Sequence, residues 1–417
     1  MKILVVGGGA REHAICWKLN QSDKVTKMYC APGNAGISQI AECINIKAED
    51  IEEITKFSVD KKIDMVVVGP EVPLVSGLVD MLMKKGIKAF GPNKKGARLE
   101  GSKSYSKDFM RKYNIPTAKY ETYTNLQKAL EGLQNFNTPI VVKADGLAAG
   151  KGVIICQTVK EAENAINSIM KNRKFGDAGS TVVVEEFLDG TETSLLCFVN
   201  GKDIIPMESA RDYKKAYDGD KGLNTGGMGC FSPNPIYTES LKQYIKENIL
   251  DTTLDGFIKE KIDFRGILFI GLMITENEAK VLEYNTRFGD PETEVVLPRL
   301  KSDLYSVMEK TIEGTLASDD LQWTEKQSTT VVLVSGGYPD IYEKGKEIYG
   351  LDLVDEDVIV FHGGTKLKDG KVFTDGGRVL AVTALGHTIK EAREKVYKNI
   401  VKIKFENAEY RSDIAKL

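Results

Sequence analysis

A glycine-rich run at residues 143–152 constrains the fold of this chain more than any other stretch. It reads Lys-Ala-Asp-Gly-Leu-Ala-Ala-Gly-Lys-Gly and stands between two short β-like runs, 139–142 and 153–155. This pattern predicts a β-hairpin whose glycine loop brings backbone N–H groups against a bound anion. Because Lys143 and Lys151 add positive charge at the loop, we expect the anion to be a phosphate of ATP.

The run differs from the loop of P-loop NTPases. That loop has four residues between its glycines, followed by Lys and Ser or Thr at the start of a helix. Here Gly146 and Gly150 are separated by three residues, and Gly152 stands where the hydroxyl residue should be. The residues that follow are β-branched rather than helix-forming, so a hairpin over ATP is the better interpretation.

A second run, 283–293, carries the residue types of a metal and phosphate site. Strand periodicity predicts two faces, with Leu282 and Tyr284 on one and, on the other, Val281, Glu283, Asn285 and Arg287. Glu283 and Asn285 offer hard oxygen ligands suited to Mg²⁺. Arg287 provides a fork that holds a carboxylate or phosphate through two hydrogen bonds. We expect this face to support phosphoryl transfer.

Composition excludes several other classes of function. The 57 basic and 60 acidic residues give a formal charge of -3, too balanced for a nucleic-acid surface or a basic membrane face. The six cysteines form no Cys-x-x-Cys pair, which argues against a zinc site and favours reduced thiols in the cytoplasm. No apolar run approaches the length of a membrane span, and no targeting segment is expected.

The first hundred residues alternate strand and helix patterns, which predicts a parallel βαβ sheet. The expected strands are 3–6, 25–30, 43–46 and 65–68, with helices after residue 11, at 50–58 and at 72–85. The first turn suggests a dinucleotide fold, but Glu12 replaces the third glycine of Gly-x-Gly-x-x-Gly and no acid ends the second strand. We therefore exclude a nicotinamide site. The helix start after Arg11 still favours an anion such as a substrate phosphate.

The middle of the chain contributes further predicted elements. Residues 101–113 form a basic helix-forming stretch, and 181–188 form a buried strand that ends at a polar turn, where Glu192 could accept ribose hydroxyls. A second glycine-rich stretch at 218–229 is too small and polar for a core element. We expect it to be a loop that closes over the reacting groups.

The last part of the sequence predicts two kinds of β structure. Strands at 266–274 and 280–286 would form the metal-bearing sheet. From about residue 325 the pattern turns to short strands and glycine turns, and we predict no catalytic cluster in that tail.

These motifs resemble the ATP-grasp ligases and, within them, the glycinamide ribonucleotide synthetase family. The resemblance is carried along the chain by the runs 8–14, 32–36, 69–71, 99–103, 143–152, 224–229 and 283–293. It implies an α/β and α+β multidomain fold with a Rossmann-like N-terminal domain, a two-lobed ATP-grasp core and a C-terminal β-rich domain. The expected boundaries are 1–102 for the first domain, 103–190 and 191–324 for the small and central lobes, and 325–417 for the last domain.

The resemblance implies a site for ATP with Mg²⁺ or Mn²⁺. Lys103 and Lys143 resemble the two lysines that reach ATP phosphates, and Glu192 resembles the ribose acceptor. An adenine hinge is implied at Glu185, Phe187 and Leu188, and the remaining expected ATP ligands are Lys151, Gly152 and Glu186. Glu283 and Asn285 match the metal pair of the family.

The resemblance also implies a substrate side. Arg287 resembles the residue that faces the glycine carboxylate and the transferred phosphate. The residues expected to bind substrates, in addition to Arg287, are Gly9, Arg11, Glu12, Asn34, Glu71, Thr225 and Gly226. The candidate catalytic residues are Arg287, Lys143 and Asp212.

The implied activity is ATP-dependent ligation of glycine to 5-phosphoribosylamine through a glycyl phosphate, a step of purine biosynthesis. We expect a cytoplasmic monomer that acts on small molecules and has no nucleic-acid or membrane partner. Two alternatives remain. A carboxyphosphate-forming carboxylase would share the ATP site but lack the signatures at 8–14 and 224–229. A non-catalytic nucleotide-binding protein would tolerate loss of the metal pair, which is present here.

Overall fold

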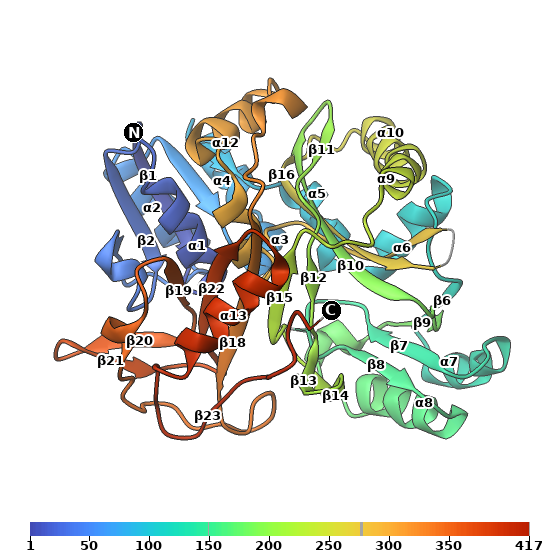
Figure 1. The fold of residues 1–417 in the computed structure, drawn as a ribbon. Helices are drawn as coiled ribbons and strands as arrows, with labels where there is room; N and C mark the ends of the chain where they lie inside the picture. Colours follow the sequence, from blue (N-terminus) through green and yellow to red (C-terminus); the bar gives the residue numbers. More distant parts are fainter. Residues whose placement is uncertain (149, 276–277, 417) are drawn as a thin grey trace.

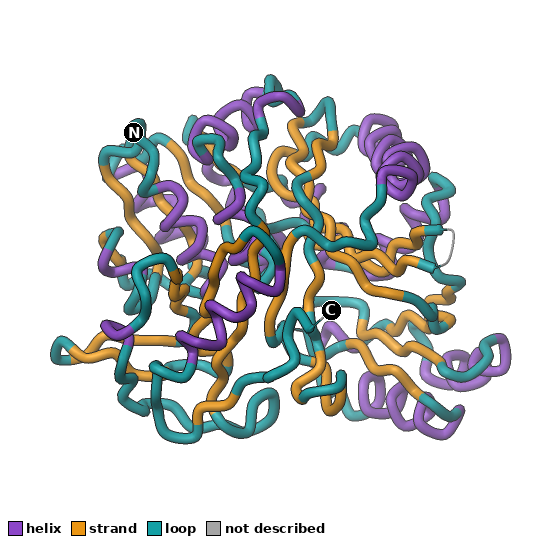
Figure 2. The backbone as a smooth tube through the Cα atoms, viewed as in Figure 1, coloured by secondary structure: helices purple, strands orange, loops and turns teal. Residues whose placement is uncertain are grey.

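In the computed structural model, which describes residues 1–148, 150–275 and 278–416, four sheets of four or more strands organise the chain. Figure 1 shows the N-terminal sheet and the small lobe at opposite sides, with the central strands between them. Most helices lie outside these sheets, as Figure 2 shows. No helix within the described ranges has the length and apolar character needed to cross a bilayer. Ala149 of the glycine hairpin lies outside the described residues.

The N-terminal sheet is fully parallel, as the βαβ pattern predicts. Its order is β3-β2-β1-β4-β5. The strands are β1 (Lys2–Gly7), β2 (Lys27–Pro32), β3 (Glu42–Cys43), β4 (Met65–Val68) and β5 (Lys88–Phe90). Ile3 and Val5 of β1 pack in one core and Leu4 and Val6 in another. Both faces of β1 are therefore covered, which explains why the strand is apolar at successive positions.

This part contains four helices, of which the first three begin close to predicted positions. They are α1 (Ala10–Leu19), α2 (Ile51–Asp60), α3 (Glu71–Ser76) and α4 (Leu78–Lys84). The single helix predicted at 72–85 is wrong, because Gly77 adopts a left-handed conformation with φ of 96° and separates α3 from α4. This break lets α3 start at the edge of the sheet with Glu71 in its first turn.

The small lobe is an antiparallel sheet covered on one face by helices (Figure 1). The strand order is β6-β9-β7-β8. The elements are β6 (Tyr120–Tyr123), β7 (Ile140–Ala144), β8 (Val153–Cys156), β9 (Val182–Glu186), α7 (Leu126–Gly132) and α8 (Val159–Ile166). Because β7 and β8 are antiparallel neighbours, the glycine run between them forms the predicted hairpin.

Helices α5 (Lys94–Gly101) and α6 (Lys103–Lys112) lead into this lobe. The basic stretch predicted at 101–113 is α6, and it begins where the Ser102 hydroxyl accepts a hydrogen bond from the Tyr105 N–H. The N-terminus of α6 therefore has a side-chain cap.

The central lobe is an antiparallel sheet in the order β11-β10-β16-β17. Its strands are β10 (Thr191–Asn200), β11 (Ile204–Pro206), β16 (Arg265–Ile274) and β17 (Ala279–Asn285), and its helices include α9 (Glu239–Ile245) and α10 (Asp251–Glu260). Apolar residues of β10 and β16 pack with α6, α9 and α10. This packing fixes β16, the hydrogen-bonded neighbour of β17, and β17 carries the predicted metal pair.

The predicted alternation of faces along β17 is wrong at Val281. The register with β16 shifts between Gly271 and Leu272, so the bulge places an extra residue in β17. As a result Val281 packs in the same core as Tyr284, while Leu282 packs in a separate cluster nearer the small lobe. Arg287 lies beyond the end of the strand, which stops at Asn285.

The C-terminal sheet takes strands from two distant parts of the sequence. Its order is β12-β15-β18-β22-β19, with β23 (Ala408–Glu409) beside β18. The other strands are β12 (Arg211–Asp212), β15 (Gly229–Ser232), β18 (Gln327–Ser335), β19 (Val358–His362) and β22 (Arg378–Gly386), with α13 (Ile389–Ile400) packed on β22 and β18. The sheet therefore spans the expected boundary at 324 and 325, and the four boundaries stay predictions.

The glycine-rich stretch at 218–229, predicted as a loop, contains a short hairpin. Strands β13 (Lys215–Tyr217) and β14 (Lys221–Asn224) pair antiparallel. The turn between them contacts the end of the chain, where Gly219 N–H donates to Asp413 Oδ2 at 2.8 Å and Arg411 pairs with Asp220 at 2.9 Å. The prediction of a structureless loop is therefore wrong over this half of the stretch.

Candidate functional site

The candidate nucleotide site lies between the small and central lobes, where several lysines meet buried carboxylates. Lys143 comes from β7, and its Nζ lies 2.9 Å from Glu185 Oε1 on β9. The other carboxylate oxygen, Oε2, lies 2.9 Å from Lys107 Nζ of α6. Burial would raise the pKa of Glu185, but the two ammonium groups outweigh it and lower that pKa. Glu185 is therefore an anion held between two cations.

Lys103 connects α6 to the glycine hairpin. Its Nζ donates to the Gly146 carbonyl at 3.1 Å, and Asp145 Oδ1 accepts the Ser104 N–H at 2.6 Å. Burial lowers the pKa of Lys103, although Glu283 acts in the opposite direction. The hairpin and the start of α6 thus form one structural unit, and the structure brings both lysines expected at ATP phosphates to it.

Glu283 and Asn285 lie side by side on β17. Asn285 Nδ2 donates to Glu283 Oε1 at 3.3 Å. Burial would raise the pKa of Glu283, but Lys214, Lys143 and Lys103 outweigh it and lower that pKa. An ionised carboxylate and an amide on the same strand offer two oxygens to a hard divalent cation once the amide turns its oxygen, rather than Nδ2, toward the ion. In the described ranges no group of three or more His, Cys, Asp or Glu side chains is placed to hold a metal. The pair is therefore suited to a cation that also keeps water or phosphate ligands.

Arg287 links the central lobe to the N-terminal part. Its Nη2 lies 3.0 Å from Glu100 Oε1, and its Nε lies 3.3 Å from Glu71 Oε2 at the start of α3. Glu100 also accepts the Thr286 N–H at 2.7 Å. A guanidinium has five N–H donors, and with its bond to the Phe288 carbonyl these contacts engage at most three of them. At least two donors remain for a ligand.

The N-terminal loop approaches the same place. Arg11 donates to the Phe288 carbonyl at 3.0 Å and to Glu12 Oε1 at 2.8 Å. Glu12 Oε2 accepts the Gly9 N–H at 2.7 Å, so this carboxylate is engaged within the loop. A Cβ on Gly69 would lie 2.1 Å from Glu12 Oε1, which explains the glycine there. The structure brings Gly9, Arg11, Glu12 and Glu71 near Arg287.

Asn34 has an internal structural role in this arrangement. Its Oδ1 accepts the Gly36 and Ile37 N–H groups at 3.0 and 2.9 Å, and its Nδ2 donates to the carbonyls of Gly8 and His362 at 3.0 and 2.6 Å. This buried amide therefore ties the N-terminal loop to β19. Its predicted contact with substrate remains untested.

The expected adenine hinge follows β9. Leu188 is buried in a small apolar cluster with Ala118 and Met273, against which Leu282 packs, whereas Phe187 is 37% exposed. Glu186 Oε1 accepts the Lys119 N–H at 2.8 Å and is thereby directed away from this cluster's centre. An apolar cluster at the end of a strand is suited to a nucleobase.

Lys214 is a residue that the sequence interpretation missed. Its Nζ lies 2.9 Å from Glu192 Oε2, the expected ribose acceptor. Glu192 raises the pKa of Lys214, against the effect of burial. Lys214 lies in the link between β12, which ends at Asp212, and β13, which begins at Lys215, and its carbonyl accepts a hydrogen bond from the Thr225 hydroxyl at 2.8 Å. Only the surrounding carboxylates distinguish it from an ordinary surface lysine.

Asp212 lies in β12 with its Oδ1 buried and without a hydrogen-bond partner among the described residues. Burial and the neighbouring Glu292 raise the pKa of Asp212 well above its ordinary value, against the effect of Lys214. A Cβ on Gly227 would lie 2.7 Å from Oδ1, so the glycine leaves space beside this oxygen. Such a carboxyl is able to hold or accept a proton.

The C-terminal tail, in which we predict no catalytic cluster, contributes a side chain that contacts the turn after Arg287, and that prediction stays untested. Arg378, the first residue of β22, lies 2.9 Å from Asp290 Oδ1 and donates to the carbonyls of Gly226 and Asp290 at 2.8 and 3.0 Å. The Gly226 N–H donates to the Tyr338 hydroxyl at 3.1 Å. The C-terminal sheet therefore fixes both the glycine-rich loop and the turn after Arg287.

Two further predicted residues contact other segments. Lys151 Nζ donates to the Pro339 carbonyl at 3.0 Å, so this end of the hairpin reaches the C-terminal part. A Cβ on Gly152 would lie 2.7 Å from the Ala148 Cβ, so the hairpin packs tightly there. Lys151 is thus separated from the group around Lys143.

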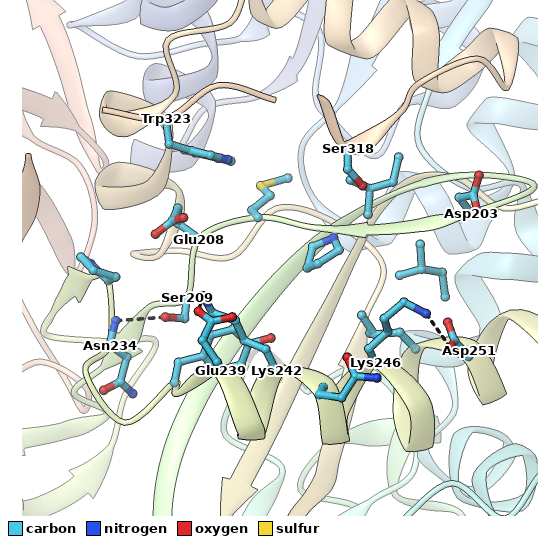
Figure 3. Close-up of a pocket in the computed structure, with 18 of the residues that line it drawn as sticks. Asp203, Glu208, Ser209, Asn234, Glu239, Lys242, Lys246, Asp251, Ser318 and Trp323 are labelled. Carbon is cyan, nitrogen blue, oxygen red and sulfur yellow. Dashed lines mark hydrogen bonds and ion pairs between the residues drawn. The ribbon is translucent and has the colours of Figure 1, made fainter. Parts of the chain in front are cut away.

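A cavity of about 860 Å³ lies elsewhere, between β11, α9, α10 and the loop that carries Trp323 (Figure 3). None of the predicted site residues lines it. Both of its lysines are paired with carboxylates of the same cavity wall: Lys246 lies 2.8 Å from Asp251 and Lys242 lies 2.6 Å from Glu239. We assign the chemistry to the lysine-rich site rather than to this cavity.

The chain matches all three parts of a known family. Residues 1–100 match the N domain of phosphoribosylglycinamide synthetase, 101–293 its ATP-grasp (A) domain and 328–417 its C domain. The match to an ATP-grasp domain implies that the protein uses ATP. The predicted fold class, including the two-lobed ATP-grasp core, is confirmed.

Curated relatives and a solved structure agree with these matches. A phosphoribosylamine–glycine ligase of Caldanaerobacter subterraneus is 50% identical over 100% of this chain and 99% of its own length. That of Clostridium acetobutylicum is 49% identical, with full coverage of both chains. The crystal structure of the Thermotoga maritima ligase is 35% identical, covers 99% of this chain and 100% of its own, and has a TM-score of 0.88. The chain belongs to the phosphoribosylamine–glycine ligase family.

Proposed function

We propose that this protein joins glycine to 5-phosphoribosylamine with ATP, giving glycinamide ribonucleotide, ADP and phosphate. This proposal depends on two observations taken together. The chain is similar over its full length to phosphoribosylamine–glycine ligases, and its lysine-rich site includes Glu283, Asn285 and Arg287. The substrates are small molecules, and we retain a cytoplasmic monomer as a prediction.

The proposed ATP position runs from the hinge to the glycine hairpin. The apolar cluster of Leu188 supports placement of adenine there. Glu185 Oε1 is buried and accepts no hydrogen bond of good geometry from the described residues, although Lys143 Nζ lies 2.9 Å away. We propose that it accepts a hydrogen bond from the amino group of adenine. We propose that Glu192 accepts ribose hydroxyls and that Lys103 and Lys143 face the phosphates.

We propose that Glu283 and Asn285 hold Mg²⁺ or Mn²⁺. The ionised carboxylate of Glu283 supports this assignment, and Asn285 would join it by turning its amide so that Oδ1 takes the place of the Nδ2 that now faces Glu283. When bound, such a cation would offset charge on the phosphate oxygens. Arg287 and the lysines supply further positive charge around the transferred group.

The first chemical step would use the carboxylate of glycine. One of its oxygens attacks the γ-phosphorus of ATP, the bond to the β-phosphate oxygen breaks, and ADP leaves. Arg287, with at least two free donors, would hold the glycine carboxylate in line. Its own position is held by Glu71 and Glu100. The product is glycyl phosphate, from which closely packed loops would exclude water.

In the second step the amine of phosphoribosylamine attacks the carbonyl carbon of glycyl phosphate, and phosphate leaves as the amide forms. The attacking nitrogen must lose a proton. We propose the ionised carboxylate of Asp212 as the acceptor, because its Oδ1 is unpartnered and its raised pKa makes the carboxylate a stronger base.

We propose that phosphoribosylamine lies between the N-terminal loop and the C-terminal sheet. A cavity of about 200 Å³ is lined there by residues that include Gly9, Ala10, Tyr338, Gly364 and Arg378. The start of α1 and the Arg378 guanidinium supply positive charge for its phosphate. The predicted contributions of Arg11, Glu12 and Glu71 fit the same end of the site.

The test is mass-spectrometric detection of glycinamide ribonucleotide from ATP, Mg²⁺, glycine and phosphoribosylamine generated from ribose 5-phosphate and ammonia. We expect product only when every component is present, in step with ADP. A Glu283→Gln variant should abolish product while Lys112→Met, a change at an exposed lysine of α6, should not. ADP formation without this product would refute the proposed acceptor, and no turnover at all would refute the activity.

A further inference from the structure

Lys107 is a buried cation for which the proposed chemistry gives no role. It lies on α6 one helical turn after Lys103, and its side chain is only 3% exposed. A lysine is rarely buried unless it is paired, because removing an ammonium from water carries a large free-energy cost, so the carboxylate that pairs with Lys107 indicates what its charge does. Its presence beside the nucleotide site therefore calls for a function of the charge itself.

The contacts of Lys107 are all internal. Its Nζ lies 2.9 Å from Glu185 Oε2 and donates to the Thr117 hydroxyl at 2.7 Å. Thr117 in turn donates to the Val281 carbonyl at 2.6 Å, at the bulged part of β17. Lys107 therefore joins α6, β9 and β17, and it has no open path toward a ligand.

Lys143 approaches the same carboxylate from the other side. Its Nζ lies 2.9 Å from Glu185 Oε1 and donates to the Leu282 carbonyl at 3.3 Å. Two ammonium groups thus share one carboxylate. If Lys107 were absent, Lys143 would be the sole counter-ion of a buried anion, and withdrawing it would leave that charge uncompensated.

We propose that Lys107 is a positioning residue for ATP: it compensates the charge of Glu185, so that Lys143 is free to direct an N–H group to the nucleotide. This inference rests on the proposed ATP-dependent function. It predicts that Lys107 acts on nucleotide affinity through Glu185 and Lys143 and makes no contact with ATP itself.

The charge of Lys107 is expected to be lost in mildly alkaline solution. The pKa of Lys107 is lowered to about 8, chiefly by burial and also by Lys143, while Glu185 and Glu283 oppose the change. The other groups that face it are Lys103 of the same helix and the ring of Tyr120 on β6, whose centroid lies 6.0 Å from Nζ. Affinity for nucleotide should therefore weaken as the pH rises through this value.

A role in packing alone is the competing explanation. The side chain also passes the Tyr120 ring, so its removal could loosen the junction of α6 with β6 without any electrostatic effect. The two explanations differ in whether the effect of Lys107 depends on the charge of Glu185. A double-mutant cycle between these residues separates them.

The experiment compares Lys107→Met, Glu185→Gln, the double variant and Lys112→Met, a matched loss of an exposed lysine on the same helix. KM for ATP and kcat are measured, together with the Kd of a non-hydrolysable ATP analogue and the midpoint of unfolding. We expect Lys107→Met to raise KM and Kd about tenfold, as for loss of a charged hydrogen-bonding group, with a smaller effect on kcat. Lys112→Met should match the wild type.

The cycle decides the mechanism. In the Glu185→Gln background, Lys107→Met should change the Kd by less than about twofold. The wild-type Kd should rise above pH 8, and this rise should be absent in Lys107→Met. An unchanged Kd in Lys107→Met, or the same tenfold loss in both backgrounds, would overturn the inference. If the wild type did not ligate glycine but the double-mutant cycle measured with the ATP analogue gave the expected Kd values, the proposed function would be refuted and this inference would stand.

Discussion

Arg378 offers a direct test of how the C-terminal sheet supports the site. Replacement by Met removes the guanidinium and keeps an extended apolar side chain. Three oxygens lose their partner: Asp290 Oδ1 at 2.9 Å, and the carbonyls of Gly226 and Asp290 at 2.8 and 3.0 Å. The Tyr338 hydroxyl still holds the Gly226 N–H. The loop is thus loosened without being released.

The magnitude follows from the burial of the ion pair. Removing one partner of a buried pair costs about 3–5 kcal/mol, and the side chains of Arg378 and Asp290 are 24% and 17% exposed, so we expect about 3 kcal/mol. Because Gly226 and Asp290 flank the proposed reacting groups, part of this loss should appear in catalysis. We expect kcat/KM for phosphoribosylamine to fall at least about tenfold, the equivalent of 1.4 kcal/mol.

The assay combines urea unfolding with initial rates of ADP release, varying each substrate in turn. Arg393→Met is the matched control, since Arg393 lies in the same domain and also donates to two carbonyls, those of Ile414 and Ser412 at 2.9 and 2.7 Å. It should lower stability and leave kcat/KM unchanged. If Arg378→Met kept kcat/KM within about twofold of the wild type for all three substrates, the argument that Arg378 positions the loop would be refuted.

Three other changes test separate features. Glu283→Gln should reduce kcat by about 100-fold or more with an unchanged unfolding midpoint, and Mg²⁺ binding by calorimetry should weaken; activity near the wild-type level would contradict the metal assignment. Gly227→Ala should reduce both stability and kcat, since φ is 119° and the new Cβ would lie 2.4 Å from Pro291 Cδ. Gly370→Ala, also at a positive φ (75°) but with no neighbour within 4 Å of the new Cβ, should affect stability alone. Burial lowers the pKa values of His13 and His362 to about 3 and 4. Below pH 6.5 the unfolded chain therefore binds more protons than the folded one, and the free energy of unfolding should fall by about 2 kcal/mol for each imidazole at pH 5. Equal urea midpoints at pH 7 and pH 5 would exclude this.

The sequence predicts well those elements whose pattern is local. The parallel N-terminal sheet follows from alternating apolar strands and helices, and the hairpin follows from glycines between two β-branched runs. The metal pair is also local, since two residues that alternate on one strand remain neighbours whatever the strand packs against. Their function as ligands stays a prediction.

The remaining features depend on contacts between distant residues. The bulge in β17 arises from its register with β16, so the face of Val281 could not be read from periodicity. Lys107 looks like any helix-surface lysine until β9 places Glu185 beside it. Arg378 follows two glycines that suggest only a turn, and Asp290 reaches it from a separate part of the chain.

The shared C-terminal sheet sets a limit on how this protein can be divided for engineering. Strand β15 pairs with β18 from Gly229–Val331 to Ser232–Ser328, so a chain cut at residue 324 would lose that neighbour. The unpaired backbone N–H and C=O groups of β15 and the newly exposed ring of Phe231 would then form a strand edge that is prone to aggregation. Two fragments expressed together should instead recover a soluble enzyme, because β18 would complement β15 in trans.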